Sequence, residues 1–229
     1  TLIEIVSKKG WQTGIVVTST ITHATPACFY AHVDDRNKHE EIANFLPTSD
    51  VDFFAGAGLK YFNMRKDGKN LLKTFEENGF IIETESLRDF ESAEKLGFLL
   101  APTSMPTMLE GRGNFLQEAS KLALKRLTNT NGFFLMVEGS QVDWGGHDND
   151  ADYLIAELID LDNTLGDILD FSEADGETLV VVTGDHETGG FTLAAKDGDY
   201  NTIVPTFSTK NHSATMVPVF AFGPGAENF

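Results

Sequence analysis

The stretch Phe133-Phe134-Leu135-Met136-Val137-Glu138-Gly139-Ser140-Gln141-Val142-Asp143-Trp144-Gly145-Gly146-His147 joins a continuous apolar run to a group of polar side chains. A continuous apolar run is typical of a strand that is buried on both faces of a parallel sheet, whereas a half-exposed strand alternates. An ionised carboxylate at the end of such a strand, here Glu138, is costly unless it is paired or bound to a metal. The stretch therefore indicates an α/β fold with chemistry at its strand ends.

Outward from this stretch, similar apolar runs predict further strands, and amphipathic runs predict helices. The expected strands are Ile15–Thr18, Val51–Ala55, Gly79–Glu83, Phe98–Ala101, Phe133–Glu138, Leu179–Thr183 and Val217–Phe222. The expected helices include one that begins with the capping box Thr1-Leu2-Ile3-Glu4 and closes at Gly10, and another over Asn114–Leu127. A long helix from about Asp150 should bury the stripe Leu154, Leu158, Leu161, Leu165 and Ile168. We expect a single α/β domain over residues 1–229, with a mainly parallel sheet flanked by helices on both faces.

Composition excludes some classes of function. The net charge of −18 disfavours binding to nucleic acid or to an anionic membrane surface, because both require a cationic footprint. No apolar run reaches the roughly 18 residues of a membrane span. The single cysteine, Cys28, excludes an intramolecular disulfide, and its apolar surroundings predict a buried thiol.

Three segments next to predicted strands carry side chains that bind zinc in proteins. In an open α/β sheet, ligands bind beyond the carboxyl ends of the strands. Asp143 and His147 are four residues apart, so a helix would place both on one face, where an oxygen and an imidazole can share one Zn²⁺. The same pair could instead be a helix cap and a surface residue. Adjacent Asp185 and His186 follow a strand and could reach one ion or form only a turn, and a lone His212 before a strand is usually structural.

A fourth segment, Thr22-His23-Ala24-Thr25-Pro26, also follows a predicted strand. The Thr25 hydroxyl could bind a hard cation such as Mg²⁺, or it could cap the helix that Pro26 opens. Arg36 is a candidate phosphate clamp, because a guanidinium binds phosphate oxygens in a bidentate manner.

Together these strings resemble the alkaline phosphatase family, in the family's order and over essentially the whole chain. The matching strings are Thr22–Ala27, Ala31–Arg36, Ala57–Phe62, Val137–His147, Thr183–Gly190, and His212 with Phe222–Gly225. The resemblance implies a phosphate monoesterase that uses two zinc ions and one magnesium ion. The short interval between Asp185 and His212 resembles a compact bacterial form.

The resemblance also implies a role for each matched residue. The first zinc would be held by Asp143, His147 and His212, the second by Asp185 and His186, and the magnesium by Glu138 and Thr25. Arg36 would clamp the phosphate and act in catalysis. His23 and Trp144 lie where family members vary, and the resemblance implies that they contribute to phosphate binding or tune the third metal site.

The resemblance leaves the nucleophile outside the chain. The family's serine, in an Asp-Ser-Ala-like motif, precedes the matched region, and Ser19, Ser49 and Ser140 lack that context. We therefore expect a chain that is incomplete at both ends and has little turnover alone, while the intact protein acts through a phosphoserine. The resemblance further implies phosphate monoesters and inorganic phosphate as ligands and a periplasmic or secreted protein, and it leaves a homodimer open.

Two alternatives remain at this point. One is another metal-dependent phospho- or sulfo-hydrolase or mutase of the same superfamily. The other is a non-catalytic zinc-binding fragment.

Overall fold

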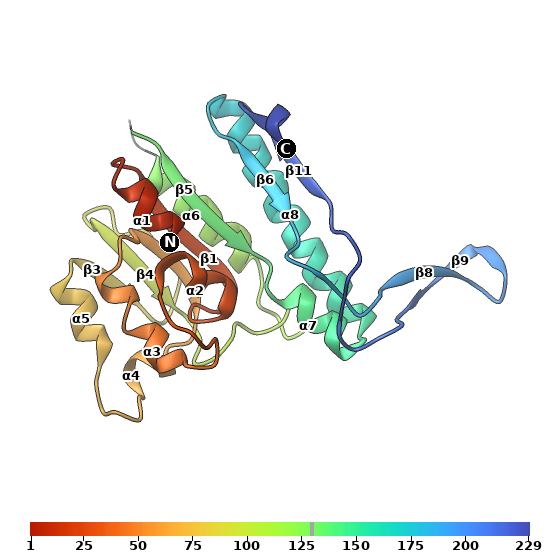
Figure 1. Ribbon diagram of the computed structural model, residues 1–229, viewed down its shortest axis with the longest axis horizontal. Coiled ribbons are helices and arrows are strands. Elements are labelled where there is room, and N and C mark those ends of the chain that lie inside the picture. Colours follow the sequence, from red (N-terminus) through yellow and green to blue (C-terminus); the bar gives the residue numbers. More distant parts are fainter. Residues whose placement is uncertain (129–130) are drawn as a thin grey trace. The chain divides into compact units, whose positions relative to one another are not determined.

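The computed structural model describes residues 1–128 and 131–229, which form two compact units (Figure 1). The first unit comprises Thr1–Pro106 and Arg112–Glu138, and the second comprises Thr107–Gly111 and Gly139–Phe229. The expectation of a single domain over 1–229 stays a prediction.

The first unit contains a five-stranded parallel sheet in the order β3-β4-β2-β1-β5. The strands are β1 (Gln12–Thr20), β2 (Phe53–Ala57), β3 (Phe80–Glu83), β4 (Lys95–Leu99) and β5 (Phe133–Glu138). Each contains or overlaps an expected strand, although β4 starts three residues before the predicted Phe98. The parallel arrangement follows from the apolar runs, because both faces of such strands are buried.

Helices cover both faces of this sheet, as the sequence predicts. One face, with Ile15, Val17 and Phe54, packs into the core formed by the short helices. These are α1 (Leu2–Ser7), α2 (Ala24–Tyr30), α3 (His39–Ala43), α4 (Lys60–Asn63) and α5 (Leu71–Glu77), with a 3₁₀ turn at Leu46–Thr48. Successive side chains alternate between faces, so Gly14 points the other way, and a Cβ there would lie 2.6 Å from Leu127. Leu127 ends α6 (Phe115–Leu127), which therefore covers the second face.

Two predicted helix ends are confirmed in detail. Thr1 and Glu4 form the expected capping box of α1, whose last helical residue is Ser7. The chain then turns through Gly10, whose N–H donates to the Ser7 carbonyl, so Gly10 closes the turn and not the helix itself. Helix α6 matches the predicted range Asn114–Leu127 to within one residue, with Asn114 as its N-cap.

The second unit is built on helices and short antiparallel ladders. Helix α7 (Gln141–Asp148) leads into the long α8 (Ala151–Asp175), which Asp150 caps through a hydrogen bond to the Tyr153 N–H. Strand β6 (Val180–Thr183) lies beside α8 in Figure 1 and pairs with β11 (Val219–Phe222). A hairpin joins β8 (Thr192–Lys196) to β9 (Asp199–Thr206), β7 (Glu187–Thr188) pairs with β10 (His212–Ser213), and a 3₁₀ turn spans Ala226–Asn228. The strands at Leu179–Thr183 and Val217–Phe222 therefore exist but pair antiparallel, outside the five-stranded sheet.

The predicted buried stripe of the long helix is wrong in most positions. Leu154 is buried, but Leu158 is 47% exposed, and Leu161, Leu165 and Ile168 are only half-buried. The other buried residues of α8 are polar: Glu157, Asp160, Thr164 and Ser172. Glu157 explains part of this burial, since its carboxylate accepts a hydrogen bond from the Met108 N–H at 2.8 Å. Periodicity shows which residues share a face of a helix, but it does not show which face is covered.

Two further observations concern the surface. The Cys28 thiol is exposed, so the prediction of a buried cysteine is wrong, because its side of α2 faces solvent. Within the described ranges 1–128 and 131–229, no helix combines the length and hydropathy that a membrane crossing requires.

Candidate metal centre

Helix α7 supplies the first two candidate ligands. Asp143 and His147 lie one turn apart on the same helix face, with 3.4 Å between Asp143 Oδ1 and His147 Nε2. The two glycines between them permit close packing. A Cβ on Gly145 would lie 2.6 Å from the Leu154 backbone nitrogen, and one on Gly146 would lie 2.8 Å from the Thr188 carbonyl oxygen. The sequence Trp-Gly-Gly thus lets α7 approach both α8 and β7.

The short β7–β10 ladder supplies the third ligand. Its register pairs His212 with Thr188, which places the His212 ring 3.5 Å from the ring of His186, centroid to centroid, in a stacked arrangement. The His212 Nε2 atom lies 3.0 Å from His147 Nε2 and 3.5 Å from Asp143 Oδ1. Two segments about 65 residues apart in the chain therefore meet at one point.

Second contacts of the histidines fix where their protons lie. The His147 Nδ1 atom is 2.7 Å from the Lys210 carbonyl oxygen, which can only accept, so Nδ1 donates and the neutral ring has its lone pair on Nε2. The Thr188 hydroxyl donates to Asp143 Oδ1, so its 3.2 Å contact with His186 Nδ1 requires that nitrogen to donate. The neutral ring of His186 therefore also has its lone pair on Nε2. A metal-bound histidine commonly makes this kind of second contact.

The group of Asp143, His147 and His212 fits a zinc ion. In a tetrahedral site with bonds of about 2.0–2.1 Å, neighbouring ligand atoms are about 3.3–3.4 Å apart. The three observed separations are 3.0, 3.4 and 3.5 Å. Lone pairs and a carboxylate that face each other this closely repel unless a proton or a cation lies between them. One oxygen and two imidazole nitrogens are a donor set that zinc accepts.

Asp185 and His186 form a second pair next to this group. The Asp185 carboxylate is largely exposed, and its Oδ2 atom lies 3.3 Å from His186 Nε2. His186 donates from Nδ1 to Thr188, which leaves its Nε2 atom directed at the Asp185 carboxylate. The pair therefore offers one oxygen and one nitrogen to a second cation.

The first unit holds the remaining candidates. Strands β1 and β5 are parallel neighbours. Glu138 at the end of β5 therefore lies at the same carboxyl end of the sheet as the segment after β1. Thr25 is the second residue of α2 and not its N-cap, which is His23, so the capping alternative for Thr25 is wrong. Arg36 is exposed, and its Nη2 atom lies 3.5 Å from His23 Nε2. The oxygens of Glu138 and Thr25 are of the type that magnesium prefers.

Trp144 is half-buried on α7 in the second unit. The structure thus brings five candidates together in the second unit, namely Asp143, His147, Asp185, His186 and His212. In the first unit, Arg36 lies beside His23. Glu138 lies at the carboxyl end of the sheet, where the chain leaves β1 toward Thr25.

Sequence reasoning missed several neighbours of these residues. Thr188 bridges Asp143 and His186, and Lys210 holds His147 through its carbonyl oxygen. Glu187, next to His186, accepts a hydrogen bond from the Ser213 hydroxyl and others from the Gly190 and Phe191 N–H groups, which hold the pKa of its carboxyl below its usual range. The adjacency of Glu187 and Thr188 to His186 is the only signal that the sequence offered.

His39 lies outside the segments that match the family. Its ring stacks on Tyr61 at 4.5 Å, and its Nδ1 atom contacts the Thr22 hydroxyl at 3.0 Å. Burial, with the nearby cations of Lys60 and Arg36, lowers the pKa of His39.

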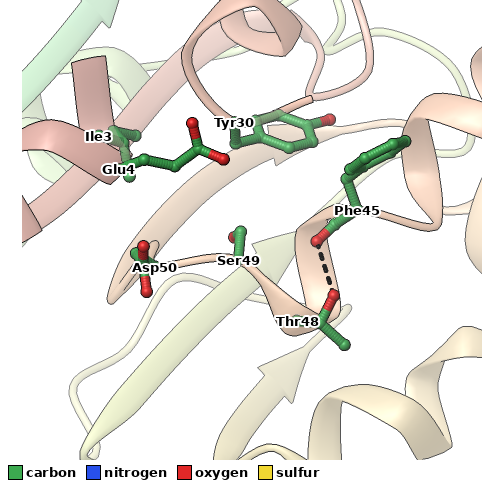
Figure 2. A pocket seen from close by; sticks show the side chains of 7 residues that line it. All are labelled: Ile3, Glu4, Tyr30, Phe45, Thr48, Ser49 and Asp50. Atoms are coloured by element: carbon green, nitrogen blue, oxygen red, sulfur yellow. Dashed lines mark hydrogen bonds between the residues drawn. The ribbon is translucent and has the colours of Figure 1, made fainter. Parts of the chain in front are cut away.

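A small cavity elsewhere contains none of the candidate residues. Its volume is about 120 Å³. Figure 2 shows the side chains that line it, which are those of Ile3, Glu4, Tyr30, Phe45, Thr48, Ser49 and Asp50. The Tyr30 hydroxyl donates to the Ile21 carbonyl, and the Thr48 hydroxyl donates to the Phe45 carbonyl. These groups are engaged in holding the first unit together.

Comparison with known proteins identifies the family to which the chain is similar. The family model for alkaline phosphatase matches residues 1–228. Alkaline phosphatase 3 of Bacillus subtilis is 37% identical over 231 residues, which cover 96% of this chain and 48% of that protein. The repressible alkaline phosphatase of Saccharomyces cerevisiae is 35% identical, covering 83% of this chain and 40% of the yeast protein. The chain thus spans about half the length of the curated relatives it matches.

Solved structures agree with this assignment. The alkaline phosphatase from the Antarctic bacterium TAB5 has 55% identity and a TM-score of 0.97, covering 100% of this chain and 69% of that chain. A TAB5 mutant with aspartate in place of a histidine, which has Mg bound in the M3 site, matches equally well. The fold class predicted from the sequence is confirmed.

Proposed function

Because the chain belongs to the alkaline phosphatase family, we propose that the protein to which it contributes hydrolyses phosphate monoesters with two zinc ions and one magnesium ion. The observation that supports this most strongly is the meeting of Asp143, His147 and His212 at one point. Their separations suit a zinc ion, and the Lys210 carbonyl orients His147 for that task.

The donor groups of the chain divide among three metal positions. Asp143, His147 and His212 would hold one zinc, Asp185 and His186 the other, and Glu138 with Thr25 the magnesium. When bound, such cations stabilise negative charge on phosphoryl oxygens and lower the pKa of a bound water or alcohol. The net charge of −18 would not oppose an anionic substrate, because the bound cations would dominate the potential near the site.

The chain's own residues would bind and orient the phosphate. Arg36 is exposed, and within the described ranges 1–128 and 131–229 its hydrogen-bond partner is His23 and not an acid, so its guanidinium is able to bind two phosphoryl oxygens. His23, whose Nε2 atom contacts Arg36, would orient that guanidinium. Trp144, on the same helix as Asp143 and His147, would shape the phosphate side of the metal centre.

We propose that a serine outside residues 1–229 takes the phosphoryl group and returns it to water. The bond from phosphorus to the leaving oxygen breaks as the bond to the serine oxygen forms, and water then cleaves the phosphoserine to release inorganic phosphate. The chain of residues 1–229 alone would therefore show little or no turnover. The family's export suggests a periplasmic or secreted protein, and a homodimer remains a proposal for its assembly.

The experiment compares the full-length protein with its Arg36→Ala and His147→Ala variants on an aryl phosphate and on an aryl sulfate. Turnover of the phosphate is expected, with a loss of about 10²–10³-fold in kcat for Arg36→Ala. His32→Ala is the control, since His32 lies outside the site and contacts Glu4. Preference for the sulfate, or full activity of either site variant, would contradict the proposal.

A separate assay addresses the isolated chain. Turnover by a pure sample of residues 1–229, free of contaminating phosphatase, would show that the chain has its own nucleophile.

A further inference from the structure

Glu187 follows His186 in the chain and lies across the β7–β10 ladder from Ser213, although it is not one of the proposed ligands. Its Oε2 atom accepts a hydrogen bond from the Ser213 hydroxyl. Its Oε1 atom accepts from the Gly190 N–H at 2.7 Å and from the Phe191 N–H at 3.4 Å. Both carboxylate oxygens are therefore engaged by the protein, which argues against Glu187 as a metal ligand.

These contacts lie directly next to His186 and His212 in the chain. Glu187 follows His186 on β7, and Ser213 follows His212 on β10. The β7–β10 ladder consists of two residue pairs, His212 with Thr188 and Ser213 with Glu187. So short a ladder is marginal by itself, because a few backbone hydrogen bonds scarcely offset the entropy of ordering two strands. The Glu187–Ser213 bond adds a side-chain link across it.

The same carboxylate also fixes the turn that follows β7. Its bonds to Gly190 and Phe191 hold the chain where Gly189 and Gly190 take positive φ angles of 88° and 60°. That turn carries the Gly189 N–H, which donates to the Asn211 carbonyl next to His212 at 3.1 Å. Glu187 therefore holds His212 from two directions, through Ser213 and through the turn.

We propose that Glu187 is a positioning residue of the metal centre, whose carboxylate locks β7 to β10 so that His186 and His212 stay stacked with their Nε2 atoms directed at neighbouring zinc ions. This inference rests on the zinc sites of the proposed function. A carboxylate suits the task because charge-assisted hydrogen bonds are about twice as strong as neutral ones. Glutamine could keep the acceptor for Gly190 and donate to Ser213, whereas alanine removes every link.

The test measures zinc affinity of the 229-residue chain by competition with a chromophoric chelator. Glu187→Ala should bind zinc about 10–100-fold more weakly than the natural chain, which is the usual cost of losing a residue that orients a ligand. Ser213→Ala should lose affinity in the same direction, and Glu187→Gln should bind more tightly than Glu187→Ala. Glu173→Ala, an exposed glutamate of α8, should leave the affinity unchanged.

A second readout separates positioning from general loss of structure. Cobalt(II) in place of zinc gives a visible absorption band that reports ligand geometry, and this band should weaken or shift in Glu187→Ala and recover in Glu187→Gln. Circular dichroism establishes that each variant is folded, and Ser213→Ala and Glu187→Gln decide the matter if Glu187→Ala does not fold.

The outcomes distinguish this inference from the proposed function. Zinc affinity and a cobalt spectrum unchanged in Glu187→Ala and Ser213→Ala would overturn the positioning role and leave the zinc site intact. Absence of zinc binding by the natural chain would overturn both.

Discussion

The two units of the molecule differ in how many apolar side chains they bury. In the first unit, the core is apolar and aromatic, with Phe54, Phe62 and Phe75 completely buried. In the second unit, four of the five buried residues of α8 are polar, while Val181 and Phe220 on the β6–β11 ladder are 42% and 63% exposed. The first unit is therefore stabilised mainly by the burial of apolar side chains, and the second unit gains less stability from this source.

This contrast assigns a second role to the proposed metal ions. Where a core is small, bound metal can contribute a large share of the folding free energy, because the unfolded chain does not hold the ligands together. Asp143, His147 and His212 direct one oxygen and two nitrogens at one point, where a bound cation would hold them together. The second unit should therefore respond to zinc, and the first should not.

The largest expected effect is in the apolar core of the first unit. Phe54 is fully buried, and its ring centroid lies 5.3 Å from that of Phe75 and 5.7 Å from that of Phe80. Phe54→Ala should lower the free energy of unfolding by about 3–5 kcal/mol, since a cavity replaces the ring. Phe220→Ala in the second unit should cost far less. Equal losses in urea denaturation of the two variants would remove the contrast between the units.

Zinc binding should stabilise the second unit alone, by an amount comparable with the loss expected for Phe54→Ala. At a zinc concentration a thousandfold above the dissociation constant, binding stabilises the state that holds the metal by about 4 kcal/mol. Hydrogen exchange should therefore slow in residues 139–229 and stay unchanged in β1 and β2, and His212→Ala should abolish the slowing. Uniform slowing over both units, or none in the second, would contradict the assignment of the metal centre.

Substitutions of two glycines in the second unit should change its stability by smaller amounts and in opposite directions. A Cβ on Gly145 would lie 2.6 Å from the Leu154 backbone, so Gly145→Ala should force α7 away from α8 and cost about 1–3 kcal/mol. Gly166 in α8 has open space around it, and Gly166→Ala should stabilise by about 0.5–1 kcal/mol through helix propensity. Thermal unfolding of the two variants measures both, and a stabilising Gly145→Ala would contradict the close approach of the helices.

The smallest effect is a pH dependence confined to the first unit. Burial raises the pKa of Asp52, whose carboxylate accepts a hydrogen bond from the Thr13 N–H at 2.9 Å. A raised pKa in the folded state means that the protonated acid contributes stability below its unfolded pKa and that this contribution is lost as the pH rises through the folded value. Asp52→Asn should therefore gain stability relative to the natural chain between pH 3 and pH 7, by less than about 1 kcal/mol. Denaturation curves at the two pH values test the sign, and a relative loss at pH 7 would show that the charged carboxylate is favoured by folding.

The sequence predicted the parts of the structure that depend on local pattern. Apolar runs gave the strands of the parallel sheet, and the four-residue spacing of Asp143 and His147 gave their shared helix face. It did not predict the polar burial of Glu157 and Asp160, because helical periodicity is silent about which side other elements cover.

The sequence also did not predict contacts between segments that are far apart in the chain. The Glu187–Ser213 bond joins residues 26 positions apart and depends on the register of the β7–β10 ladder. Thr188 was passed over because its role becomes visible only when Asp143 and His186 flank its hydroxyl.

The most direct measurement is anomalous diffraction at the zinc absorption edge from crystals of the chain grown with zinc. A peak should lie at bonding distance, about 2.0–2.2 Å, from His147 Nε2, His212 Nε2 and a carboxylate oxygen of Asp143. Zinc bound only at other residues, with these three side chains turned apart, would contradict the metal centre on which the proposed function depends.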